Sequence, residues 1–219
     1  MTVTEPRLTL ERRLLKEYPI VIACDEVGRG ALAGPVAVGA AVIDLSRSRK
    51  KIPVGLRDSK LVPELRRADV ASRAASWVSD SAVGWASSVE IDEIGIMGAL
   101  GLAAIRAVAD LRARGVVPET AIVILDGNYD YITPAGGEGL RVTPVIKADR
   151  DCASAAAASV IAKVARDTLM ATLHDDLPAY NWARNKGYAS PDHREAISTH
   201  GLSAHHRHSR AIADAPTLF

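Results

Sequence analysis

The sequence predicts an α/β domain, in which helices flank a five-stranded mixed sheet and a small helical appendage follows at the C-terminus. Three observations predict it: short apolar runs rich in Val and Ile, helical periodicity between them, and the loss of both patterns beyond Pro178. A chain of 219 residues buries a sizeable core without disulfides or structural metals. We expect a main domain at residues 1–174 and the appendage at residues 175–219.

The first two strands are predicted at residues 19–24 (PIVIAC) and 35–43 (PVAVGAAVI). A glycine-rich turn joins them, so we expect them to be neighbours in the sheet. A helix is predicted at residues 63–78, where Pro63 suits a first helical turn. A third strand is predicted at residues 81–89, where polar and apolar residues alternate.

Strands and helices then mix along the chain. A helix at residues 91–115 is expected to end at Gly115, and strands follow at residues 121–126 (AIVILD) and 140–147 (LRVTPVIK). The intervening residues 128–139 (NYDYITPAGGEG) predict a long flexible loop.

The last long helix is predicted at residues 152–176 and is rich in alanine. Alanine favours helix and lets a helix lie close to a sheet, so its alanine face should be buried. A short helix at residues 191–201 and a basic tail complete the appendage.

The formal net charge of +1 and the pI near 7.8 exclude the strongly basic balance of a purely electrostatic DNA coat. Basic clusters at residues 47–51, 65–69 and 205–210 are, taken singly, typical of solvated surface. The two cysteines, Cys24 and Cys152, form no disulfide framework, and we expect both to be thiols in the core. We find no apolar run of membrane-spanning length and no apolar segment of a secretion signal, so a cytoplasmic protein without a membrane partner is expected.

Acidic residues close three of the predicted strands. Asp25 and Glu26 end the first strand, Asp126 ends the fourth, and Asp149 follows the fifth. For any one of them a turn, a helix cap or an exposed position would suffice, but the set meets at the edge where α/β sheets place their sites. Adjacent strand residues point to opposite faces, so Asp25 and Glu26 share one site only if the strand ends or bulges there.

Four carboxylates without His or Cys make an oxygen-only site, which suits Mg²⁺ or Mn²⁺ and is poor for zinc. Two divalent ions are the usual device for displacement at a phosphodiester. The residues alone therefore point to a nuclease.

Two other motifs are weighed and rejected. The stretch GRGALAG approximates a dinucleotide fingerprint, but the strand-like segment that follows it cannot be the helix this motif requires. Four histidines near the C-terminus fit no common zinc spacing, and a basic tail near phosphate is the preferred interpretation. They are His200, His205, His206 and His208.

Six motifs resemble ribonuclease HII in their order and near their spacing, over about residues 18 to 210. They are DEVGRG, AGPV, LRDSKLV, ILDGN, KADRDCASAAAASVIAKVARD and NKGYASPDHREAISTHGLSAHHR. The resemblance implies a ribonuclease H-like fold and a monomeric, metal-dependent enzyme. It would cut on the 5′ side of a ribonucleotide, in RNA/DNA hybrids and at single ribonucleotides in duplex DNA, leaving 3′-hydroxyl and 5′-phosphate ends. Removal of ribonucleotides and RNA primers in DNA replication and repair would follow.

The resemblance places the catalytic metal ligands on Asp25, Glu26, Asp126 and Asp149. Asp151 competes for the fourth position, but only Asp149 holds the Lys-x-Asp place in the motif. The same resemblance assigns Gly28, Arg29, Gly30 and Tyr188 to the ribose 2′-hydroxyl, which distinguishes RNA from DNA. Tyr188 could instead merely anchor the appendage. Phosphate contacts are expected from Arg57, Ser59, Lys60 and Lys186.

The chain departs from the family pattern at Ala31, where Pro is common, at Gly95, where Asn is frequent, and in the length of the 128–139 loop. None of these removes a catalytic group. A non-catalytic module would be expected to lose an acid, and all four are present. A resolvase is disfavoured by the GRG and GY motifs, and a ribonuclease HIII by the short stretch of about twenty residues before the first strand.

Overall fold

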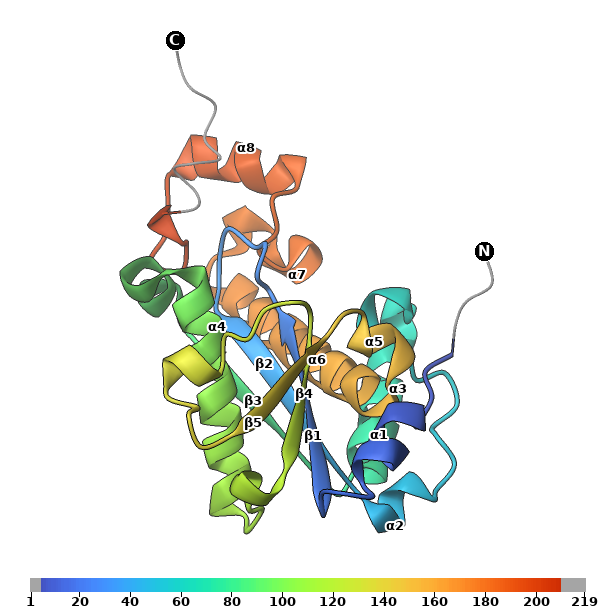
Figure 1. The fold of residues 1–219 in the computed structure, drawn as a ribbon. Helices are drawn as coiled ribbons and strands as arrows, with labels where there is room; N and C mark the ends of the chain where they lie inside the picture. The colour runs from blue at the N-terminus through green and yellow to red at the C-terminus, as the bar shows by residue number, and fades with distance from the viewer. Residues whose placement is uncertain (1–4, 210–219) are drawn as a thin grey trace.

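A computed structural model describes residues 5–209. Its sheet has five strands in the order β3-β2-β1-β4-β5 (Figure 1). The first three strands are antiparallel neighbours, whereas β4 and β5 run parallel to β1, so the predicted mixed sheet is confirmed. The strands are β1 (Ile20–Val27), β2 (Val36–Asp44), β3 (Asp80–Ala86), β4 (Ile122–Asp126) and β5 (Arg141–Val145).

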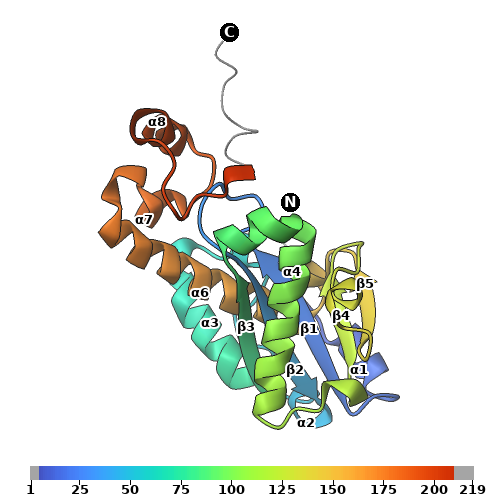
Figure 2. The same cartoon turned by 90° about the vertical axis from the view of Figure 1, so that its left-hand side faces the viewer.

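Long helices cover both faces of the sheet. Figure 2 shows α4 (Ser88–Ala113) crossing one face, with α3 (Glu64–Trp77) and α6 (Ala153–Asp176) on the other. Short helices connect and extend these layers. They are α1 (Thr9–Leu14), α2 (Leu45–Ser48), α5 (Ala148–Asp151), α7 (Trp182–Asn185) and α8 (Pro191–His200), with 3₁₀ turns η1 (Ser59–Leu61), η2 (Pro118–Thr120), η3 (Thr133–Ala135) and η4 (Pro178–Tyr180).

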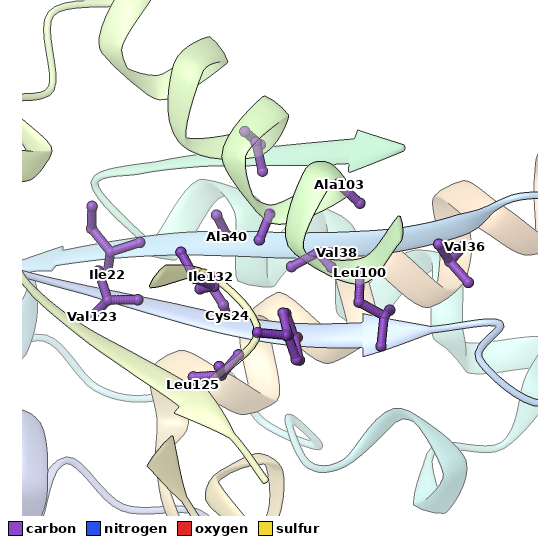
Figure 3. Packing of buried hydrophobic residues seen from close by; sticks show 14 of the residues in the cluster. Ile22, Cys24, Val36, Val38, Ala40, Leu100, Ala103, Val123, Leu125 and Ile132 are labelled. Atoms are coloured by element: carbon purple, nitrogen blue, oxygen red, sulfur yellow. The ribbon is translucent and has the colours of Figure 1, made fainter. Parts of the chain in front are cut away.

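The larger core cluster lies between α4 and the sheet. Leu100 and Ala103 of α4 pack there with Ile22 of β1 and Val38 of β2 (Figure 3). Truncating a buried leucine such as Leu100 to alanine costs about 2–5 kcal/mol. On the opposite face α6 is buried along its alanines, as the sequence predicts.

The third strand ends at Ala86, three residues before the predicted end at residue 89. Ser87 caps α4, since its side chain accepts from the N–H of Glu90 while the Glu90 carboxylate accepts from the N–H of Ser87. This capping box starts the helix at Ser88, before the predicted residue 91. Gly95, with φ 74° and ψ 163°, then interrupts the helical conformation.

Residues 128–139 form a loop between β4 and β5, as predicted, but the loop is anchored in the core. The segment contains η3, and both Tyr131 and Ile132 are buried in the α4 core cluster. The Asp130 carboxylate accepts hydrogen bonds from the N–H groups of Ile132 and Thr133 and from the Thr133 hydroxyl. Two apolar side chains and one capping acid therefore hold the segment against the sheet.

Helix α4 is long and apolar enough to cross a membrane by length and composition, which makes it the one such helix within residues 5–209. The expectation that no apolar run reaches that length is therefore wrong. Its buried contacts with the sheet account for its composition, as in a core helix.

The C-terminal segment lies beyond the end of the sheet (Figure 1). An apolar cluster that includes Met170 of α6, Tyr180 and Trp182 joins it to Ala33, in the segment between β1 and β2. Helix α6 ends at Asp176, so the expected boundary after residue 174 falls in its last turn. The division into a main domain and an appendage stays a prediction.

Candidate active site

The four predicted acids meet at one edge of the sheet. Asp25 and Glu26 lie near the C-terminal end of β1, and Asp126 ends the parallel strand β4 beside it. Lys147 ends the extended backbone after β5 with a left-handed conformation (φ 60°). It is the N-cap of α5, the helix that carries Asp149. The N–H of Asp149 donates to Oδ1 of Asp126 at 3.2 Å, which brings the two segments together.

Asp25 and Glu26 are expected from the sequence to share one site only if strand β1 ends or bulges there. The strand does neither between them. Its pairing with β2 continues through Asp25, Glu26 and Val27. The two carboxylates therefore point to opposite faces of the strand. Glu26 lies on the side of Tyr131, whose hydroxyl donates to it at 3.5 Å, and both acids line one cavity.

The electrostatics of the acids reflect burial and mutual repulsion. Asp25 is only 7% exposed, and burial, aided by Asp126, Glu26 and Asp149, raises its pKa well above the usual range against a hydrogen bond from Ser159. Burial likewise raises the pKa of Glu26, opposed by Arg29. Burial and Asp126 raise the pKa of Asp149 to about 6. Such a set gains from a nearby cation.

Within residues 5–209, no three His, Cys, Asp or Glu side chains are already grouped as a metal site. The chemistry of the acids nevertheless fits hard divalent cations, because every donor is a carboxylate oxygen. Burial and mutual repulsion raise the pKa of three of them, and a bound cation would offset both effects by favouring the ionised carboxylates.

Asp151 is placed differently from Asp149. Its carboxylate forms a bidentate pair with Arg150 at 2.7 Å, and its side chain is 43% exposed. Asp149 is 8% exposed and lies with its carboxylate 4.0 Å from the Lys60 ammonium. The geometry therefore favours Asp149 over Asp151 as the fourth member of the acid cluster.

A cavity of about 500 Å³ opens beside the acids. Tyr188 and the segment after β1 line it, together with basic side chains from η1, α3 and α6. The lining residues are Asp25, Glu26, Val27, Gly28, Arg29, Gly30, Ser59, Lys60, Arg67, Lys163 and Tyr188.

Two basic residues of this cavity were not predicted as substrate contacts: Arg67, in the 65–69 cluster interpreted as solvated surface, and Lys163. Lys163 pairs with Asp167 one helical turn along α6 at 2.6 Å, and Arg67 lies 3.7 Å from the same carboxylate. Arg67 also donates to the carbonyls of Ser59 and Val62, which holds η1 at the cavity. The i, i+4 spacing of Lys163 and Asp167 was visible in the sequence, but it is equally typical of a solvated helix face.

Not every predicted substrate contact reaches the cavity. Arg57 and Lys186 lie outside its lining, and the Lys186 ammonium is 3.8 Å from Glu64. Ser59 is at the cavity, but its hydroxyl accepts a 3.0 Å hydrogen bond from Ser159 of α6. Ser59 therefore also connects η1 to the helix behind the acids.

The two glycines of the GRG motif occupy different surroundings. Gly28 has φ 85°, and a Cβ there would lie 2.1 Å from Nε of Arg166. Gly30 has nothing within 4 Å of an added Cβ and is exposed. Gly28 is required by the protein interior, whereas the open space at Gly30 is available to a bound molecule.

The interpretation of the histidines as a basic tail is wrong for His206, which is buried, as is Arg207 beside it. Trp182 donates to Nε2 of His193 at 3.0 Å, so Nδ1 of that ring carries the proton and donates to the Tyr188 carbonyl at 2.8 Å. Nε2 of His206 lies 3.2 Å from the same acceptor nitrogen. Neutral imidazoles therefore connect the C-terminal segment to the backbone of Tyr188. Arg210 of the predicted basic cluster lies outside the described residues.

Comparisons with known proteins agree with this geometry. The ribonuclease HII family model matches residues 22–211. Ribonuclease HII of Streptomyces coelicolor is 45% identical over 217 residues, which cover 98% of this chain and 88% of the relative. The Magnetococcus marinus protein is 40% identical over 208 residues, covering 93% and 92%.

Solved structures share the fold. Ribonuclease H2 from Pyrococcus horikoshii OT3 aligns with a TM-score of 0.64 at 24% identity, covering 90% of this chain and 97% of that one. Bst-RNase HIII in complex with Mn²⁺ aligns with a TM-score of 0.72 at 22% identity, covering 96% and 74%. The RNase HII of the Archaeoglobus fulgidus PCNA complex aligns with a TM-score of 0.64 at 27% identity, covering 86% and 94%. The fold is thus the predicted ribonuclease H-like one, and the chain belongs to the ribonuclease HII family of ribonucleases H, which act on RNA/DNA hybrids.

Proposed function

We propose that this ribonuclease H hydrolyses the phosphodiester on the 5′ side of a ribonucleotide, both in RNA/DNA hybrids and at single ribonucleotides embedded in duplex DNA. One observation supports this most: Asp25 and Glu26 of the oxygen-only acid cluster line the same cavity as a glycine segment and Tyr188. The acids would carry out the hydrolysis, and the glycine segment and Tyr188 would contact the ribose. The products are 3′-hydroxyl and 5′-phosphate ends.

The proposed metal ligands are Asp25, Glu26, Asp126 and Asp149, with two Mg²⁺ or Mn²⁺ ions as cofactors. When bound, divalent ions lower the pKa of water and stabilise charge on the scissile phosphate. The Mn²⁺ in the Bst-RNase HIII structure supports the choice of metal by analogy. A water oxygen attacks phosphorus, the P–O3′ bond breaks, and the departing oxygen takes up a proton.

Recognition is proposed to come from Gly28, Arg29, Gly30 and Tyr188. Main-chain groups of the glycine segment can bond the 2′-hydroxyl, and the tyrosine offers a ring and a hydroxyl to the same sugar. Lys60 lies 4.0 Å from Asp149, and Arg67 and Lys163 line the same cavity, which supports phosphate contacts from these three side chains. Arg57, Ser59 and Lys186 remain predicted contacts, with Arg57 and Lys186 serving phosphates away from the cavity.

In the cell, we propose a cytoplasmic monomer, without a membrane partner, that removes RNA primers and misplaced ribonucleotides during DNA replication and repair. The PCNA complex of the Archaeoglobus fulgidus relative supports a role at replicating DNA by analogy.

A mapped nick tests the proposal. A DNA duplex carrying one ribonucleotide is labelled at its 5′ end and incubated with the protein with and without Mg²⁺, beside an all-DNA duplex. We expect a single Mg²⁺-dependent cut immediately 5′ of the ribonucleotide and none in the all-DNA control. A cut on the 3′ side, or equal cutting of the control, would contradict it.

A further inference from the structure

The Arg166 guanidinium connects two segments that are far apart in the sequence. Arg166 lies on α6, is fully buried, and donates three hydrogen bonds to main-chain carbonyls. The acceptors are Pro35 at 2.9 Å and Ala33 at 3.1 Å, in the segment between β1 and β2, and Lys186 at 2.9 Å. Lys186 is two residues before Tyr188, so one side chain bonds the two segments that also carry the glycine and tyrosine lining of the cavity.

The same guanidinium contacts the recognition groups themselves. Its Cζ lies 5.3 Å from the centroid of the Tyr188 ring, a distance at which an arginine interacts with an aromatic face. An added Cβ on Gly28 would collide with its Nε. Arg166 therefore separates the glycine segment from the tyrosine and leaves little freedom between them.

We infer that Arg166 is a positioning residue that fixes the Gly28–Gly30 segment relative to Tyr188, and so sets the preference for an isolated ribonucleotide. The inference rests on the proposed function, in which these groups read the ribose. Burying a guanidinium is unfavourable unless its donors are satisfied, and an apolar chain would fill the volume without that cost. An apolar chain could not hold three carbonyls at fixed angles, whereas the planar fork can.

Arg207 provides a matched control. It is also a fully buried arginine, and it donates to the carbonyls of Arg29, Ala31, Gly34 and Pro35. These acceptors all belong to the segment between β1 and β2. Loss of this fork should loosen that segment without directly releasing the backbone before Tyr188.

Hydrogen exchange of the substrate-free protein tests the connection. In the native fold the Tyr188 amide donates to Asn185 at 2.9 Å, and the Leu32 amide donates to Gly187 at 2.8 Å. We expect Arg166→Lys to speed exchange at both amides by about tenfold or more, because the lysine would lose one or two of the hydrogen bonds that the guanidinium donates. Arg207→Lys should affect the Leu32 amide with a smaller change at Tyr188. Equal effects of the two variants at Tyr188, or none from Arg166→Lys, would overturn the inference.

Kinetics test its consequence for selectivity. Arg166→Lys should lower kcat/KM on a single-ribonucleotide duplex, relative to a continuous hybrid, by about tenfold to a hundredfold. In a Tyr188→Ala background the same change should alter that ratio by no more than about twofold, since the residue that Arg166 positions is already gone. Additive effects would mean that Arg166 acts independently of Tyr188, against the inference.

A second variant covers the case in which Arg166→Lys does not fold. Gly28→Ala pushes directly on the guanidinium, so it should speed exchange at Tyr188 although the two residues are distant in the sequence. Exchange raised only near residue 28 would contradict the inference. Because these measurements need no substrate, they judge Arg166 even if the unmodified protein fails to cut at ribonucleotides, which would refute the proposed function alone.

Discussion

The main-chain N–H of Asp149 donates a 3.2 Å hydrogen bond to Oδ1 of Asp126, which fixes the start of α5 against the end of β4. The two acids are therefore joined by a hydrogen bond even though their negative charges repel each other. An asparagine at position 126 keeps an acceptor oxygen for this bond while it removes the charge. Substitution can thus separate the structural role of the carboxylate from its chemical one.

We predict that Asp126→Asn and Asp149→Asn each abolish most cleavage while the protein stays folded, because each removes charge that a divalent cation needs. Cleavage of the single-ribonucleotide duplex and the circular dichroism spectrum measure the two effects. Asp151→Asn is the control and should stay active, since its carboxylate pairs with Arg150. An active Asp149→Asn beside an inactive Asp151→Asn would reverse the assignment.

In EDTA at pH 7, Asp25→Asn should raise the thermal midpoint. Burial and neighbouring acids raise the pKa of Asp25, so its ionised form destabilises the folded state and this cost grows as pH rises. The gain should vanish in acid, where the carboxyl is protonated in both folded and unfolded chains. Thermal melts at about pH 3, below the unperturbed Asp pKa of about 3.9, and at pH 7 measure the difference, and a variant less stable at pH 7 would contradict this view of the site.

Gly28→Ala and Gly30→Ala should fail for different reasons. The first adds a methyl group against Arg166 at a positive φ, which should cost stability by about 1 kcal/mol or more. The second meets no protein atom within 4 Å, so its thermal midpoint should be near that of the unmodified protein while ribonucleotide cleavage falls. Full activity of Gly30→Ala would remove this glycine from the recognition model.

Tyr188 variants should harm an isolated ribonucleotide more than a continuous hybrid, because a hybrid offers many sugars and registers. Loss of one buried polar partner corresponds to roughly tenfold to a hundredfold in rate at a single site. Tyr188→Phe removes the hydroxyl, and Tyr188→Ala also removes the ring. Comparing both variants on both substrates separates these contributions. Equal small losses would leave Tyr188 as an anchor of the C-terminal segment.

The buried His206 should make stability depend on pH. Burial and its histidine neighbours lower its pKa to about 4, so the unfolded chain binds the extra proton between about pH 6.5 and 4. The stability due to neutral His206 is complete above about pH 6.5 and is lost as pH falls toward 4, by about 3 kcal/mol. Urea melts of the unmodified protein should show this slope, and His206→Gln should flatten it. His205→Gln, at a half-buried neighbour, should leave the slope in place.

The sequence predicted the five strands, the long helices and the convergence of the acids, because apolar periodicity and strand-end position carry that information. It could not show that β1 continues past Glu26, since the pairing with β2 is a contact between distant segments. The burial of Tyr131, Arg166 and His206 was also missed. Each depends on partners more than a dozen residues away in the sequence. Without those partners, a polar side chain is predicted to lie on the surface.

The place of β1 in the sheet also makes the backbone beside the acids more stable against local unfolding than the segments proposed to bind the ribose. Strand β1 pairs with β4 from Val21 to Cys24 and with β2 through Val27, so the amides of residues 21–24 should exchange at rates close to that of global unfolding. The groups proposed to bind the ribose lie beyond this strand, on segments held by single side chains and a few carbonyls. Because Arg166 joins the two segments, we expect them to move together as one unit while the carboxylates keep their register. Proteases should therefore cut the native chain near Tyr188 well before they reach the acids.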